Sequence, residues 1–307
     1  MVMPIPAEKP VQQSAFAHLY PFRSNFLTIN GLQYHYLDEG QGDPLLMLHG
    51  NPTWSFYFRN LISALKDHYR VIVPDHMGCG LSAKPDERQY DFRLQSRVSD
   101  LTALIDHLNP DRPLTLILHD WGGMIGLAWA LDHLNQLGRL VITNTAGFFP
   151  PHGKPIPWRL RLIRTPNALK DWMVLHLNLF ARGALYMAPF HSLAPEVKAG
   201  LIAPYNCPRN RLATLKFVQD IPLSSDHPSG TLVARVEKNL KCLAPYPTLI
   251  LWGAHDFVFD GSYFKEWRQR LPHAQCHWFD DAGHYLLEDI PDRAVACIRK
   301  FLTHEPP

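Results

Sequence analysis

The chain has 307 residues, of which 46% are apolar and 19% charged, and its formal net charge is +2. This composition fits one large α/β domain with an insertion, or two modest domains. The near-neutral charge and the lack of a Lys/Arg-rich run argue against a nucleic-acid partner. No apolar run approaches the roughly 20 residues that a membrane span requires.

The N-terminal segment and the cysteines bear on localisation. Residues 1–22 lack the charged start and unbroken apolar core of a signal peptide, and their prolines predict a loose arm that wraps the domain. The five cysteines are odd in number, scattered and without a CxxC pair. This usage is typical of thiols in a reducing compartment rather than of disulfides or a zinc site. We therefore expect a soluble, cytoplasmic protein.

Short β-branched and Leu-rich runs alternate with longer helical patterns along most of the chain. The alternation predicts a mostly parallel, eight-stranded sheet with helices on both faces. In chain order the predicted strands are 26–29, 32–37, 45–49, 71–74, 114–119, 140–144, 248–252 and 275–279. The predicted helices between and after them are about 54–66, 94–108, 122–134, 261–270 and 289–301.

The alternation stops after residue 144 and resumes near residue 248. The segment between is rich in Trp, Met, Phe, Arg and Pro, and predicts helices at about 158–163, 168–179, 194–202 and 209–218. Ligands of open α/β sheets bind at the carboxyl ends of the strands, so helices inserted above that edge form a cap. We predict a core of residues 1–146 and 231–307, with 1–22 as the arm, and a helical cap of residues 147–230.

The segment 114–123, LTLILHDWGG, leads from a strand through a tight turn into a helix. This is the layout of a nucleophile elbow, with Asp120 where a hydrolase usually carries Ser. A carboxylate there favours attack on an alkyl carbon over ordinary ester hydrolysis. An Asp after a strand can also be a plain helix N-cap. Gly122, placed where a side chain would clash, favours the elbow, although Leu118 replaces the first glycine of the usual motif.

The elbow requires a base and an acid, in the order nucleophile, acid, histidine. His284, in DDAGHYLLED just after the last predicted strand, is the candidate general base. Asp256, in LILWGAHD, is the candidate acid that orients it. The other position for the acid, after strand 140–144, offers only Asn144 and Thr145.

The loop HGNPTW, residues 49–54, follows the third predicted strand and faces the elbow. Such a loop supplies a backbone N–H to an anion hole, together with the residue after the nucleophile, here Trp121. The Asn51 amide and the Trp121 indole are further donors for a departing anion. The alternative is that Asn51 and Pro52 form an ordinary turn.

HGNPTWSF, VIVPDHMGCGLSAKP, HDWGG and WGAHD…AGHY together resemble the haloalkane dehalogenase branch of the α/β-hydrolase superfamily, from about Tyr20 to Leu302. The resemblance implies an α/β-hydrolase fold with nucleophile Asp120, base His284 and acid Asp256. It also implies an anion-stabilising pair, Asn51 and Trp121.

Other segments are more similar to the β-lactone decarboxylases of bacterial long-chain olefin biosynthesis, within that branch. These are YDFRLQSRVSDLTALIDHL, HDWGGMIGLAWAL, NTAGFFPP, PYNCPRNRLATLKFVQDIPLS and FDDAGHYLLED. In that group the cap presents arginine to the carboxyl end of the substrate, which here implies Arg209 or Arg211. Either could instead be a structural arginine bonded to cap carbonyls. The resemblance leaves open an assembly with other enzymes of the pathway.

The expected function is conversion of a cis-3,4-dialkyl-β-lactone to a cis-alkene and CO2, without metal or cofactor. Haloalkane dehalogenation is the alternative. An epoxide hydrolase would require two cap tyrosines, for which Tyr186 and Tyr205 are available, and a binding protein on this fold usually lacks one of the three catalytic side chains.

A small apolar or long-chain, lipid-like substrate requires an apolar tunnel. Candidates are Trp158, Trp172, Met173, Leu177, Phe180, Met187 and Phe190, which could instead form the core of the cap. The neighbouring basic residues could face an acidic partner, a lipid surface or only solvent: Arg159, Arg161, Arg164 and Lys170.

Overall fold

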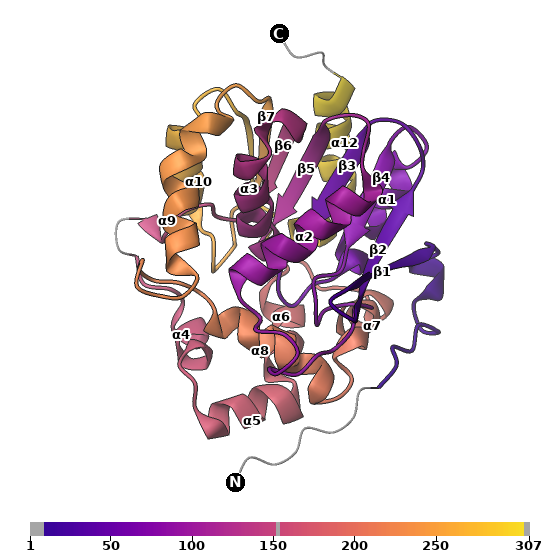
Figure 1. Cartoon of the computed structure of the whole chain (residues 1–307), viewed down its shortest axis with the longest axis vertical. Helices are drawn as coiled ribbons and strands as arrows, with labels where there is room; N and C mark the ends of the chain where they lie inside the picture. Colours follow the sequence, from indigo (N-terminus) through magenta and orange to yellow (C-terminus); the bar gives the residue numbers. More distant parts are fainter. Residues whose placement is uncertain (1–8, 152–153, 304–307) are drawn as a thin grey trace.

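A computed structural model describes residues 9–151 and 154–303. Positions 1–8 of the expected arm, 152–153 of the expected cap and 304–307 lie outside the described residues. Eight strands form one sheet in the order β1-β2-β4-β3-β5-β6-β7-β8 (Figure 1). β1 and β2 pair antiparallel, β2 pairs antiparallel with β4, and β3 to β8 run parallel. The predicted fold class is confirmed.

All eight predicted strands are present, with ends shifted by at most three residues. They are β1 (Ser24–Ile29), β2 (Leu32–Glu39), β3 (Pro44–Leu48), β4 (Arg70–Pro74), β5 (Leu114–His119), β6 (Leu137–Thr143), β7 (Thr248–Gly253) and β8 (Gln275–Phe279). Successive residues of the central strands enter opposite cores: in β5, Leu116 and Leu118 enter one core and Ile117 the other. This alternation explains why the buried parallel strands are apolar throughout.

Helices cover both faces of the sheet (Figure 1). The core that contains Leu116 also receives side chains of α2 (Leu94–Leu108), α3 (Trp121–Asp132), α9 (Gly230–Asn239) and α10 (Gly261–Arg270). The core on the other face receives side chains of α1 (Arg59–Leu65), α11 (Leu286–Asp289) and α12 (Pro291–Thr303). Part of the predicted helix 54–66 is a 3-10 turn, Ser55–Phe58, before α1.

Helix α9 was not among the predicted helices. Its buried residues Leu232, Val233 and Val236 pack in the same core as α3. Their spacing is helical, so the signal was present, but the helix is short and lies outside the strand–helix alternation that guided the prediction.

Between β6 and α9 the described residues form five α-helices, gathered beyond one end of the sheet (Figure 1). They are α4 (Trp158–Arg164), α5 (Ala168–Leu177), α6 (Leu179–Met187), α7 (Pro195–Ile202) and α8 (Leu212–Gln219). The prediction of one helix at 168–179 was wrong, because Asn178 adopts a left-handed conformation (φ 55°) that ends α5 before α6 begins.

The described part of the N-terminal arm contacts both the core and the inserted helices. Phe16 and Tyr20 are buried, and the Tyr20 hydroxyl lies 2.5 Å from Ser55 Oγ. Asn206 Nδ2 donates to the Pro10 carbonyl at 2.8 Å. Among the residues from 9 to 303 that the structure describes, no helix is long and apolar enough to span a bilayer.

Candidate active site

Asp120 lies in the tight turn between β5 and α3, with φ 50° and ψ −127°. A Cβ on Gly122 would lie 2.0 Å from the Leu48 carbonyl oxygen, and one on Gly50 would lie 2.0 Å from Asp120 Oδ1. Both glycines are therefore required by close approach. Leu118 is buried in the core and does not prevent the turn. The predicted strand–turn–helix element is present.

The two carboxylate oxygens of Asp120 have different surroundings. Oδ1 accepts a hydrogen bond from the Asn51 backbone N–H at 2.7 Å. Oδ2 lies 3.6 Å from His284 Nε2, beyond hydrogen-bond length. Thr145 Oγ1 donates to the Asp120 carbonyl and ties the turn to the end of β6. Oδ2 is thus the oxygen that remains available for reaction.

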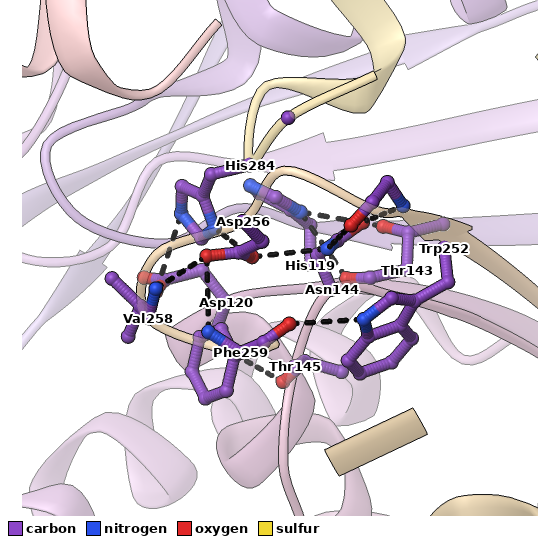
Figure 2. Close-up of polar contacts among 12 residues, drawn as sticks. His119, Asp120, Thr143, Asn144, Thr145, Trp252, Asp256, Val258, Phe259 and His284 are labelled. Carbon is purple, nitrogen blue, oxygen red and sulfur yellow. Dashed lines mark hydrogen bonds and ion pairs between the residues drawn. The ribbon is translucent and has the colours of Figure 1, made fainter. Parts of the chain in front are cut away.

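His284 and Asp256 form the hydrogen-bonded pair that their positions after β8 and β7 predict (Figure 2). His284 Nδ1 lies 2.7 Å from Asp256 Oδ2. The other oxygen, Oδ1, accepts from the backbone N–H groups of Val258 at 2.7 Å and Phe259 at 3.0 Å. These bonds fix the position of the carboxylate and hold the ring with Nε2 toward Asp120.

Asn144 is a site residue that the sequence did not reveal. Its Nδ2 donates to Asp256 Oδ2 at 3.0 Å and to the Gly253 carbonyl at 3.2 Å, and its Oδ1 accepts from the Gly253 N–H at 2.9 Å. The sequence offered Asn144 only as a position where the acid was missing. Its location at the end of β6, beside the end of β7, was the available signal.

Burial and charge shift the pKa of both reactive groups. Burial raises the pKa of Asp120, although the charge of His284 and the N–H groups of Asn51 and Trp121 oppose the rise. Burial works to lower the pKa of His284, but the charge and hydrogen bond of Asp256 outweigh it and raise that pKa above the ordinary histidine value. Because the charge of each group favours the charged form of the other, Asp120 and His284 titrate as a coupled pair.

Asn51 and Trp121 lie beside Asp120 and line the same cavity. Asn51 Nδ2 donates one hydrogen bond to the Thr214 carbonyl at 3.0 Å, which leaves its second N–H for a ligand. The Trp121 ring packs on Phe217 at 5.3 Å. The structure thus brings both predicted anion donors to the predicted nucleophile.

A cavity of about 250 Å³ lies over Asp120 and His284, between the sheet edge and helices α4, α6 and α8. Most of its lining is apolar, including Phe148, Leu160 and Val258. Of the predicted tunnel residues, Phe180 and Met187 line it, whereas Trp158, Trp172, Leu177 and Phe190 are exposed. Those four are neither in the cavity nor in a core of the cap.

Arg209 and Arg211, either of which the resemblance implies as a substrate contact, are not among the residues that line this cavity. Arg209 Nε donates to the Lys84 carbonyl at 3.0 Å. Arg211 donates from Nε and Nη1 at 2.6–3.1 Å to three carbonyls, those of Tyr205, Leu175 and His176. Both side chains thus donate to carbonyl oxygens in a loop or near the end of a helix. This is the role that the alternative of a structural arginine predicted.

Other cavity residues bear on the alternatives. Arg159 of α4, predicted only as a surface cation, lines the cavity. Neither candidate epoxide-activating tyrosine lines it: the Tyr205 hydroxyl is buried against the Thr53 carbonyl, and Tyr186 is 72% exposed. Among the described residues, no group of three His, Cys, Asp or Glu side chains could hold a metal ion.

The chain is similar to known proteins in both sequence and fold. A family model described as "alpha/beta hydrolase fold" matches residues 43–291. A cis-3-alkyl-4-alkyloxetan-2-one decarboxylase of Shewanella oneidensis is 46% identical over 93% of this chain and 90% of its own. Haloalkane dehalogenase 2 of Mycobacterium bovis is 31% identical over 91% and 95%. The solved structure of a mutant haloalkane dehalogenase DatA from Agrobacterium tumefaciens superposes with a TM-score of 0.81 at 25% identity, over 95% and 99%.

Proposed function

The chain belongs to the α/β-hydrolase family, and from this premise we propose that it converts a cis-3,4-dialkyl-β-lactone to a cis-alkene and CO2. A carboxylate nucleophile, a histidine base and an anion hole serve dehalogenases and decarboxylases alike. The observation that carries the choice is the similarity along the chain: 46% identity to a cis-3-alkyl-4-alkyloxetan-2-one decarboxylase against 31% to a dehalogenase.

In the proposed reaction Asp120 Oδ2 attacks the lactone β-carbon. The bond from that carbon to the ring oxygen breaks, and the opened ring carries a carboxylate that Asn51 and Trp121 stabilise. The bond between the α-carbon and this carboxylate then breaks, and its electron pair forms the alkene. Asp120 leaves as the free carboxylate together with CO2. No proton is gained or lost overall, and no water is consumed.

The geometry of these two steps is consistent with the cis product. Attack by Asp120 inverts the β-carbon, and an anti elimination then removes Asp120 and CO2 from opposite faces. Inversion followed by anti elimination has the same stereochemical result as losing both ring bonds from one face of the lactone. The two substituents that are cis on the ring are therefore cis on the alkene. A protonated His284 would stabilise the Asp120 carboxylate as it leaves, and the raised pKa of His284 favours that protonated form.

Dehalogenation is the second candidate, supported by the gap between His284 Nε2 and Asp120 Oδ2. At 3.6 Å the two atoms leave His284 free to activate a water that hydrolyses an ester on Oδ2. In that reaction Asn51 and Trp121 would hold the halide ion.

The substrate and setting follow from the same proposal. The apolar cavity suits a small apolar or long-chain, lipid-like molecule that an upstream β-lactone-forming enzyme supplies, in a pathway of olefin biosynthesis. An assembly with that enzyme remains part of the proposal. The five cysteines all lie within the described residues and form no disulfide, which is consistent with a cytoplasmic protein.

The test is product analysis by gas chromatography and mass spectrometry. The purified protein and Asp120→Asn each receive a cis-3,4-dialkyl-β-lactone or, separately, 1-bromobutane. Alkene that depends on Asp120, with little bromide, is the expected result. Bromide and butanol without alkene would identify a dehalogenase instead.

A further inference from the structure

Helices α4, α5 and α6 carry a concentration of exposed apolar side chains. Eight of the twelve large apolar side chains that are exposed among the described residues fall within residues 158–187. Trp158 is 63% exposed, Leu162 49% and Leu169 67%. Single exposed apolar residues are ordinary, but a group of this size on neighbouring helices marks an interaction surface. We call residues 158–187 the cap face.

The same thirty residues are strongly basic. They contain Arg159, Arg161, Arg164, Lys170 and Arg182 but only one carboxylate, Asp171, whereas the whole chain has 30 basic and 28 acidic residues. None of these five cations forms an ion pair with another described residue. A merely solvated face would not combine unmatched cations with exposed tryptophan and leucine.

The cap face also borders the mouth of the active-site cavity. Leu160 and Ile163 of α4 line that cavity, while Trp158 and Leu162 of the same helix are exposed. Leu179 and Met187 of α6 both line the cavity and reach solvent, at 45% and 37% exposure. Figure 1 shows α4 and α5 at the end of the molecule away from the sheet, where a planar surface can approach them.

We propose that the cap face docks on the surface of a bilayer that contains anionic phospholipid. Exposed Trp and Leu side chains enter the interface between headgroups and acyl chains, and those cations of the cap face that do not line the cavity contact the anionic headgroups. The contact is peripheral and reversible, because its helices are short and lie on the bilayer. It places the cavity mouth against the membrane, so that an apolar molecule can enter without crossing water.

The charge pattern favours a bilayer over a protein partner. Several cations with one carboxylate, spread over three helices, complement a continuous anionic surface. The proposal does not depend on the reaction that the site performs, since vesicle binding is measured without substrate.

The experiment is co-sedimentation with vesicles of phosphatidylcholine alone or mixed with phosphatidylglycerol, at low and high salt. We expect binding to the mixed vesicles, weakened by salt, with a blue shift of tryptophan fluorescence. Trp158→Ser with Leu162→Ser, and separately Arg161→Glu, should each reduce partitioning by about tenfold or more. Trp278→Ser on β8, of 39% exposure, and Arg88→Glu are the matched controls and should bind as the parent does.

Two results would overturn the proposal. One is equal, salt-insensitive binding to both vesicle types by the parent and all variants. The other is no vesicle binding together with a self-association, seen by sedimentation velocity, that the cap-face variants abolish. A short-chain, water-soluble lactone assayed without vesicles separates the two questions, because cap-face variants should retain parent activity on it whether or not docking occurs.

Discussion

Asn144 Nδ2 lies 3.0 Å from Asp256 Oδ2, the oxygen that also contacts His284 Nδ1. The acid of the site is therefore held from β6 as well as from the loop after β7. Removing this donor should loosen the carboxylate and, through it, the imidazole.

We expect Asn144→Ala to lower kcat by about tenfold to a hundredfold, since a hydrogen bond to a charged group contributes about 1.5–3 kcal/mol. KM should change little. Asn144 also has a left-handed backbone, with φ 37°, so Asn109→Ala at φ 39° on the surface controls for backbone strain. Equal loss of kcat in both variants would show that Asn144 acts only through backbone conformation.

The pH dependence of kcat should distinguish the two candidate reactions. Because the pKa of His284 is raised, decarboxylation assisted by the protonated ring should slow as pH rises through that pKa, whereas dehalogenation by the neutral ring should accelerate. His49 and His119 cannot cause this change, since burial lowers their pKa values, that of His49 to about 4. This change of kcat with pH should be absent in His284→Gln. A profile that is flat across this range would contradict any titrating role for His284.

Trp121→Phe tests the indole donor while retaining an aromatic ring against Phe217. Loss of one anion-hole donor typically lowers kcat about a hundredfold to a thousandfold. Trp129→Phe, in the same helix and fully within the core, provides the matched control and should leave kcat near the parent value. Steady-state kinetics on the lactone would measure both. Parent-like kcat in Trp121→Phe would remove the indole from the mechanism.

Gly50→Ala tests the packing around the nucleophile. Its Cβ would meet Asp120 Oδ1 at 2.0 Å, so the carboxylate must move and kcat should fall strongly. Gly138→Ala in β6 is the control, because Gly138 does not line the cavity and its added Cβ would meet only Pro113 Cβ, at 3.3 Å, and the Pro113 and Leu114 carbonyl oxygens, so kcat should stay near the parent value. If Gly50→Ala retained full activity, the contact between the loop and the nucleophile would not matter for the reaction.

Arg211→Met separates structural from substrate-binding roles. The variant loses donors to the Tyr205, Leu175 and His176 carbonyls, so Tm should fall by several degrees while KM for the lactone stays unchanged. Thermal unfolding and kinetics would be measured on the same preparation. A raised KM at unchanged Tm would restore Arg211 as a substrate contact.

The sequence predicted the elements on which Asp120, Asp256 and His284 depend. Asp120 and Asp256 each follow a strongly apolar, fully buried strand, and His284 follows the last strand in the expected chain order. It could not predict where long side chains in irregular segments point. Arg209 and Arg211 lie in a 3-10 turn, and only the folded chain shows which carbonyls they meet. Asn144 was missed for a related reason: its partners Gly253, at the end of β7, and Asp256, in the loop after β7, are more than a hundred residues away in sequence.

Because the two Asp120 oxygens have unequal surroundings, labelling with heavy oxygen can distinguish the two candidate reactions. Oδ1 is held by the Asn51 N–H, and only Oδ2 is free to form an ester. If water hydrolyses that ester at the Asp120 carboxyl carbon, a turnover in water enriched with heavy oxygen leaves the label on the protein. If the ester instead collapses to alkene and CO2, Asp120 leaves with both of its original oxygens. The mass of the peptide that contains Asp120 thus reports which bond the enzyme broke.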